Sequence, residues 1–139
     1  MVFDETLRKY PVVGLILRKC GYGYKFSDTK ITLEKGVLVF IPVSAIHHDP
    51  KYYRDPEEFD PERFSPENKS KIPSCAYLPF GDGPRMRFAE VQSMIGLAAF
   101  LNKFKVEASS KAKKNLEIDP TALTLTSKDG IWVNIKRRY

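Results

Sequence analysis

The sequence predicts an α+β fold, because apolar residues follow a helical period in two stretches and alternate along several short ones. The segment between them is rich in proline, which excludes both a long helix and a central strand there. With 139 residues, 42% of them hydrophobic, the chain is long and apolar enough to form one ordinary domain with its own core.

The first helix is expected over residues 1–10, and Pro11 ends it. One stripe of this helix is apolar, formed by Val2, Phe3, Thr6 and Leu7. No residue precedes Met1 to accept hydrogen bonds from the first free N–H groups of the helix. We therefore expect the chain to be a fragment of a longer protein.

Short strands are expected next. Residues 12–18 are expected to be extended, and residues 24–42 are expected to form strands with turns at 27–28 and 35–36. Residues 47–66 carry four prolines and are expected to form an ordered meander fixed by aromatic side chains.

The clearest helical pattern covers residues 86–103. Its middle, residues 94–101, is apolar almost all round, so we expect burial on more than one side. Residues 122–126 and 131–135 alternate around a turn at 127–130, which predicts a C-terminal hairpin.

Composition narrows the class of protein only in part. Lysine and arginine number 23 against 17 acidic residues, and the net charge of +6 suits an acidic protein partner, an anionic cofactor or a membrane surface. Cys20 and Cys75 show no metal-ligand spacing and indicate a reduced protein. No secretory signal is visible, and the longest strongly apolar run is too short to cross a bilayer, so no membrane segment is predicted.

Three motifs suggest chemistry. Glu5 and Arg8 are three apart on one helix face, where they can form an ion pair, and Arg63 from the meander could join them. The stretch "PFGDGPR" at 79–85 is rich in glycine and ends in arginine just before a helix, which suits an anionic ligand. Taken singly, the Glu–Arg spacing is better explained by an ordinary surface ion pair.

Together these motifs resemble a known family. E-T-L-R at 5–8, D-P-E-R-F at 60–64 and "PFGDGPR" at 79–85, in this order, resemble the C-terminal portion of a cytochrome P450, most closely the insect microsomal branch that metabolises xenobiotics. Residues 45–64 and 87–104 are similar to the family over their full lengths. The resemblance covers nearly the whole chain and implies that residues 1–139 are the C-terminal part of one catalytic domain.

The resemblance also implies roles for individual residues. Glu5, Arg8 and Arg63 match the family's Glu–Arg–Arg network. Phe80 would pack near the haem, and Gly81 and Gly83 would let the backbone turn tightly under the ring. The haem propionates would be bound by Arg18 and Arg85. The substrate pocket would be bordered by Val12, Val13, Leu15, Ile16, Leu125 and Thr126, each of which, taken singly, could also be plain core.

One part of the family pattern is absent. In the family the loop arginine is followed by x-C-x-G, whose cysteine ligates the haem iron, whereas Arg85 is followed directly by Met86-Arg87-Phe88. No metal ligand or catalytic residue is therefore predicted. Cys20, Cys75 and the two histidines of the meander are interpreted as structural residues. The resemblance implies a haem-dependent monooxygenase that acts on small apolar substrates in the endoplasmic reticulum membrane, with electrons from an NADPH-dependent reductase. This chain is expected to be inactive as written.

The alternative function is binding without catalysis. Five lysines lie beside or just after the long helix and could bind an acidic reductase weakly: Lys103, Lys105, Lys111, Lys113 and Lys114. A solvated basic loop is the simpler interpretation of the same residues. Nucleic-acid binding is not predicted, because these lysines have neither interleaved aromatic residues nor a recognisable motif.

Overall fold

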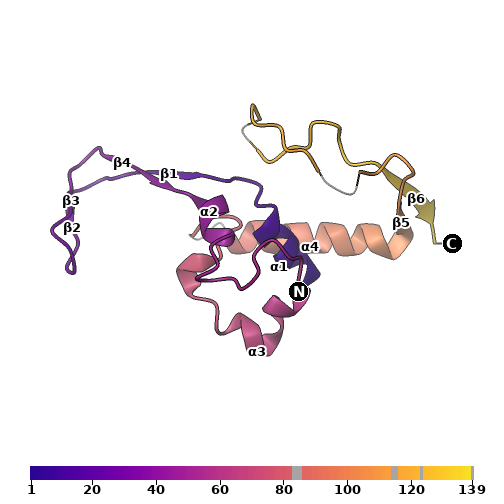
Figure 1. Cartoon of the computed structure of the whole chain (residues 1–139), viewed down its shortest axis with the longest axis horizontal. Helices are drawn as coiled ribbons and strands as arrows, with labels where there is room; N and C mark the ends of the chain where they lie inside the picture. The colour runs from indigo at the N-terminus through magenta and orange to yellow at the C-terminus, as the bar shows by residue number, and fades with distance from the viewer. Residues whose placement is uncertain (83–85, 114–115, 123, 139) are drawn as a thin grey trace.

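The computed structural model describes residues 1–82, 86–113, 116–122 and 124–138. A central unit contains the helices α1 (Val2–Lys9), α2 (Val43–His47) and α3 (Pro66–Lys69) and the 3₁₀ turns η1 (Pro61–Phe64) and η2 (Ser74–Ala76). A strand arm extends from it on one side, and α4 (Met86–Lys103) extends on the other (Figure 1). The structure combines helices with small antiparallel sheets, which confirms the α+β fold predicted from the sequence.

The first helix buries its polar face. Its buried residues are Asp4, Glu5 and Arg8, whereas Val2 is 63% exposed. The apolar stripe expected from the sequence is therefore not the main packing face. The reason is that α1 packs on η1 and on the meander, whose backbone groups need hydrogen-bonding partners.

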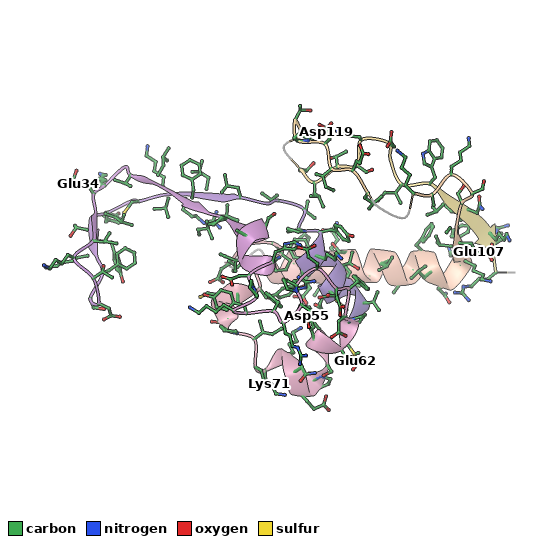
Figure 2. All side chains as sticks on the ribbon, in the orientation of Figure 1. Glu34, Asp55, Glu62, Lys71, Glu107 and Asp119 are labelled. Atoms are coloured by element: carbon green, nitrogen blue, oxygen red, sulfur yellow. The ribbon has the colours of Figure 1, made fainter. Side chains whose placement is uncertain are left out.

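The strand arm consists of two antiparallel pairs. Ile16–Lys19 (β1) pairs with Leu38–Ile41 (β4), and Tyr24–Lys25 (β2) pairs with Thr32–Leu33 (β3). Gly36 has a φ of +93°, which explains why glycine occupies the turn expected at 35–36. Side chains crowd the centre of the molecule around Asp55, whereas those of the arm near Glu34 project into open space (Figure 2).

The meander is ordered by side chains rather than by a ladder of backbone bonds. Tyr53 is 2% exposed, and its hydroxyl donates to the Ala76 carbonyl at 2.8 Å. The Asp60 carboxylate accepts from the Glu62 N–H at 3.0 Å and so caps η1. The small hydrophobic core lies here and consists of Val43, Tyr53, Phe64, Ala76 and Leu78.

The C-terminal strands pair differently from the expected hairpin. Val133–Arg137 (β6) pairs antiparallel with Phe104–Ala108 (β5), not with residues 122–126. The segment 122–126 is engaged elsewhere, because the Leu125 N–H donates to the Val12 carbonyl at 3.0 Å. The predicted turn at 127–130 is present, since the Gly130 N–H donates to the Ser127 carbonyl at 3.2 Å.

The long helix begins and ends as predicted, but its apolar surface is not buried within the described part of the chain. Residues 91–101 are all exposed, and Ile95 is 64% exposed. The helix packs on β5 at its C-terminal end, where the Phe100 and Phe104 rings lie 5.1 Å apart. A helix that is apolar all round needs neighbours on several sides, and the described residues supply few. Among these residues no helix is long and apolar enough to span a membrane.

The hydroxyl of Tyr53 tests the role of the meander in stability. Tyr53→Phe removes the donor to the buried Ala76 carbonyl, and we expect a loss of about 1–2 kcal/mol in the free energy of unfolding. Tyr52→Phe is the matched control, because Tyr52 is 36% exposed, and we expect a change within about 0.5 kcal/mol. Denaturant midpoints measure both variants, and equal effects would contradict the assignment.

Candidate functional site

Glu5 and Arg8 form a fully buried ion pair. The Arg8 Nε lies 2.7 Å from Glu5 Oε2, and the Arg8 Nη2 lies 2.9 Å from Glu5 Oε1. Both side chains are 0% exposed. Helical i,i+3 spacing brings the two groups together, and the two-point geometry suits a guanidinium and a carboxylate.

Arg8 also binds the meander backbone. Its Nη1 donates to the His47 carbonyl at 2.8 Å, and its Nη2 donates to the Pro56 and Glu58 carbonyls at 2.9 and 3.2 Å. Its guanidinium carbon lies 5.2 Å from the centre of the Tyr53 ring. A single side chain thus binds the carbonyl at the end of α2 and two carbonyls of the meander, whose own backbone hydrogen bonds form only short turns.

Arg63 lies beside this pair. Its Nε is 3.6 Å from Glu5 Oε1, and its Nη2 donates to the Asp55 carbonyl at 2.8 Å. Glu5 Oε1 also accepts from the Asp60 N–H at 2.9 Å. The structure therefore brings Glu5, Arg8 and Arg63 together around the meander.

His47 and His48 contact backbone groups. The buried His47 ring lies 3.0 Å from the Arg8 carbonyl through Nδ1 and accepts from the Leu78 N–H at 2.9 Å through Nε2. Burial lowers the pKa of His47 to about 4, and the nearby positive charges of Arg8 and His48 contribute to the lowering. His48 Nδ1 lies 2.8 Å from the Ser44 carbonyl. Both ring nitrogens of His47 are occupied, so neither is free for iron.

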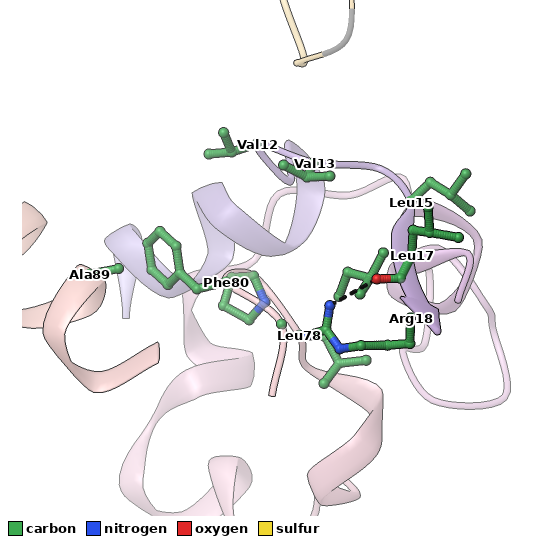
Figure 3. A pocket seen from close by; sticks show the side chains of 11 residues that line it. Val12, Val13, Leu15, Leu17, Arg18, Leu78, Phe80 and Ala89 are labelled. Carbon is green, nitrogen blue, oxygen red and sulfur yellow. Dashed lines mark hydrogen bonds between the residues drawn. The ribbon is translucent and has the colours of Figure 1, made fainter. Parts of the chain in front are cut away.

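An open pocket of about 400 Å³ lies between β1 and the segment that leads to α4. Phe80 and Ala89 lie at one end and Arg18 at the other, with Val12 and Val13 along one side (Figure 3). Its lining comprises Val12, Val13, Leu15, Ile16, Leu17, Arg18, Leu78, Pro79, Phe80, Gly81 and Ala89. Four of the six residues expected at the substrate pocket and two of the four expected at the haem thus line the same pocket.

The geometry at Gly81 explains the glycine. Gly81 has a φ of +78°, and an added Cβ would lie 3.4 Å from both Arg18 Nη2 and Ile16 Cδ1. The backbone conformation therefore favours glycine at this position, whereas the space around it would admit a Cβ at van der Waals contact.

The remaining predicted residues are placed differently. Leu125 is bonded to Val12 through its backbone but lines a neighbouring pocket, next to His48. The Thr126 carbonyl accepts from the Asp119 N–H at 2.8 Å, and its hydroxyl donates to the Thr124 carbonyl at 3.0 Å. Gly83 and Arg85 lie outside the described residues.

The donor set of the pocket allows a test of whether haem fits. Apolar walls suit the face of a porphyrin, and Arg18, the one ionisable residue in the described lining, suits a carboxylate. Neither cysteine lines the pocket: Cys20 Sγ lies 2.7 Å from the Tyr22 carbonyl, and Cys75 is exposed beside Ser74. The pocket therefore fits the periphery of haem and does not fit a thiolate-ligated iron. No group of three acidic, histidine or cysteine residues that could hold a metal exists among the described residues.

The expected basic face is partly neutralised. Lys105 lies 3.1 Å from Glu107, Lys113 lies 2.5 Å from Asp129, and the Lys111 ammonium lies 5.3 Å from the centre of the Trp132 ring. The ion pair raises the pKa of Lys113 and lowers that of Asp129. Lys103 is exposed, and Lys114 lies outside the described residues.

Sequence reasoning missed the part played by His47 and Leu78. The motif spacing gives no sign that a meander histidine bonds a backbone N–H thirty-one residues later. The one available signal is that His47 lies inside the segment 45–64, which is similar to the family over its full length.

Arg8→Met tests the buried pair. The substitution keeps the volume but leaves the Glu5 carboxylate buried without its partner, and we expect a loss of about 3–5 kcal/mol in the free energy of unfolding. Arg54→Met is the control, because Arg54 pairs with Asp55 but its side chain is 94% exposed, and we expect less than about 1 kcal/mol. Denaturant unfolding of both variants gives the comparison. A small loss for Arg8→Met would mean that the pair does not hold the meander.

Comparison with known proteins identifies the family of the chain. The family model for cytochrome P450 matches residues 1–133. The chain is 48% identical over 141 aligned positions to cytochrome P450 6B1 of Papilio polyxenes, 43% identical to cytochrome P450 6B7 of Helicoverpa armigera and 42% identical to probable cytochrome P450 6a14 of Drosophila melanogaster. These matches cover 98–99% of this chain and 28% of the length of each relative. The chain therefore belongs to the cytochrome P450 family, whose cofactor is haem.

Proposed function

We propose that residues 1–139 form the haem-facing, C-terminal part of a single cytochrome P450 catalytic domain, and that the sequence as it stands does not assemble an active monooxygenase. One observation carries this proposal. The pocket joins Arg18 and Phe80 to an apolar wall, yet no cysteine occurs anywhere after Cys75.

For the whole protein, the family supports oxidation of small apolar substrates by O₂, with electrons from an NADPH-dependent reductase at the endoplasmic reticulum membrane. The apolar lining is the part of this chain that supports such substrates. Four apolar side chains line this part of the pocket, namely Val12, Val13, Leu15 and Ile16. They would select a substrate by its shape and by apolar contact.

The residues present would hold the periphery of the haem. The guanidinium of Arg18 donates to the Leu17 carbonyl at 3.1 Å and has further donors for a propionate, and Arg85 would bind the second. Phe80 and Gly81 would lie against the ring, with Gly83 completing the turn. Leu125 and Thr126 would approach the substrate side through the Leu125–Val12 backbone bond.

The missing sulfur limits the chemistry. When bound, a thiolate-ligated haem supplies the electron donation that favours O–O cleavage. Cys20 belongs to the strand arm and Cys75 to an exposed turn, so neither replaces that ligand in this fold. Binding of a reductase without catalysis has less support, because Lys105 and Lys113 already have carboxylate partners.

The first test is spectroscopic. We expect the purified chain, mixed with haem, reduced and treated with carbon monoxide, to show no thiolate-type absorbance band, because no cysteine follows Arg85. The ferrous–CO spectrum is the measurement, and Cys75→Ala is the control. A thiolate-type band in the native chain would overturn the proposal, and its loss in Cys75→Ala would identify the ligand.

The second test restores the ligand. The chain is joined behind the N-terminal portion of the Papilio polyxenes relative, with or without Asn-Cys-Ile-Gly inserted between Arg85 and Met86. We expect a thiolate-type band only with the insertion, because Arg18 and Phe80 are already placed. Inserting Asn-Ala-Ile-Gly is the matched control, since it restores loop length without sulfur. A band in the joined protein that lacks the insertion would show that the absent cysteine is not disabling.

A further inference from the structure

His47 connects the buried ion pair to the pocket. On one side it meets α1 twice, because Arg8 Nη1 donates to the His47 carbonyl at 2.8 Å and the His47 Nδ1 lies 3.0 Å from the Arg8 carbonyl. On the other side its Nε2 lies 2.9 Å from the Leu78 backbone nitrogen. The residue is 0% exposed.

These contacts fix the tautomer of the ring. A carbonyl can only accept, so Nδ1 must carry the hydrogen that is donated to Arg8. The Leu78 N–H can only donate, so Nε2 must carry the lone pair. The two hydrogen bonds are therefore made together only by the neutral ring protonated at Nδ1.

Leu78 is the start of the turn that forms one pocket wall. The Leu78 carbonyl accepts from the Gly81 N–H at 3.1 Å, which closes the turn, and Pro79 has no N–H to contribute. Leu78, Phe80 and Gly81 all line the pocket. Because His47 holds the N–H of the first residue of this turn, it sets where the wall stands relative to α1.

The surroundings of the ring oppose a positive charge. Arg8 on α1 and His48, the residue that follows α2, are the nearby groups whose positive charge opposes one on His47. The Tyr53 and Tyr77 rings lie 6.4 and 5.7 Å away, and their hydroxyls donate to the carbonyls of Ala76 and Asp4. The Glu5 carboxylate is already occupied by Arg8. Together with burial, this keeps the pKa of His47 low, at about 4.

We propose that His47 is a positioning residue that ties the pocket wall Leu78–Gly81 to the Glu5–Arg8 pair, and that proton uptake at its Nε2 releases this wall while the Glu5–Arg8 pair stays formed. The Nδ1–H of a protonated ring still donates to Arg8, so the link breaks on the Leu78 side alone. This role concerns the protein's own backbone and stands independently of whether the pocket binds haem.

Two backbone amides of the unmodified chain distinguish the pocket wall from the Glu5–Arg8 pair. The Leu78 N–H is held by His47, and the Asp60 N–H is held by Glu5 at 2.9 Å. His47→Asn keeps a donor for Arg8 but cannot reach Leu78, whereas His47→Gln places an acceptor near the Nε2 position. By amide hydrogen exchange we expect His47→Asn to speed exchange at Leu78 roughly fivefold to tenfold and to leave Asp60 unchanged. We expect His47→Gln to restore most of the protection at Leu78.

His48→Gln is the matched control, because His48 neighbours His47 but bonds the Ser44 carbonyl, and we expect no change at Leu78. The proposal is overturned if His47→Asn leaves Leu78 unchanged, or if Leu78 and Asp60 lose protection together, which would indicate general loosening.

The unmodified chain provides a test that does not depend on any variant folding. Long-range ¹H–¹⁵N spectra should show His47 protonated at Nδ1 at about pH 7. The protection of the Leu78 amide from hydrogen exchange should fall as the pH approaches 4, whereas the protection of the Asp60 amide should stay the same. Protonation at Nε2 at about pH 7 would overturn the proposal.

The low pKa of His47 also predicts how the free energy of unfolding of the chain changes with pH. The pKa of His47 is about 4 when folded and 6.5 in the unfolded reference, so its contribution is fully present above pH 6.5 and is lost as the pH falls toward 4. The urea midpoint should decrease over this window in the native chain. In His47→Gln that part of the decrease should disappear, and an unchanged slope in His47→Gln would contradict the assignment.

Discussion

The buried pair between Glu5 and Arg8 is the interaction on which the rest of the central unit depends. A proline-rich segment lacks an N–H group at each proline and forms no ladder here, so many of its carbonyls and amides need side-chain partners. Arg8 supplies donors to the His47, Pro56 and Glu58 carbonyls, and Glu5 accepts from the Asp60 N–H. The pair itself is costly to desolvate. We infer that its value lies in fixing one path for the meander rather than in net stability.

A short series of hydrogen bonds connects the Glu5–Arg8 pair to the pocket. The Arg8 carbonyl and guanidinium hold His47, and His47 holds the Leu78 N–H. The turn that begins at Leu78 then brings Phe80 and Gly81 to face Arg18 and Ile16. The wall of the pocket is thus positioned by polar contacts deep in the central unit, although the larger part of the pocket's lining is apolar.

This protein keeps the shape of the pocket but lacks the cysteine that would ligate the haem iron. The pocket retains the features that suit the periphery of haem, namely an apolar wall and a guanidinium with donors to spare. The cysteine whose thiolate would complete the site is absent from the sequence after Cys75. A binding surface can therefore persist when the group that gives it chemistry is missing, because the surface is specified by packing and the reactivity by one side chain. The exposed apolar length of α4 is in keeping with a chain that spans 28% of the length of its relatives.

The sequence by itself determined the extents of α1 and α4, the irregular meander and the missing cysteine, because helical period, proline and residue identity are local properties. Only the tertiary structure decided which face of α1 is buried, that β6 pairs with β5, and that His47 reaches Leu78. Each of these depends on a partner distant in sequence. Burying a polar helix face costs desolvation energy, which is offset only by hydrogen bonds to the carbonyls of the meander. Those carbonyls are distant in sequence, so the local residue pattern does not reveal them.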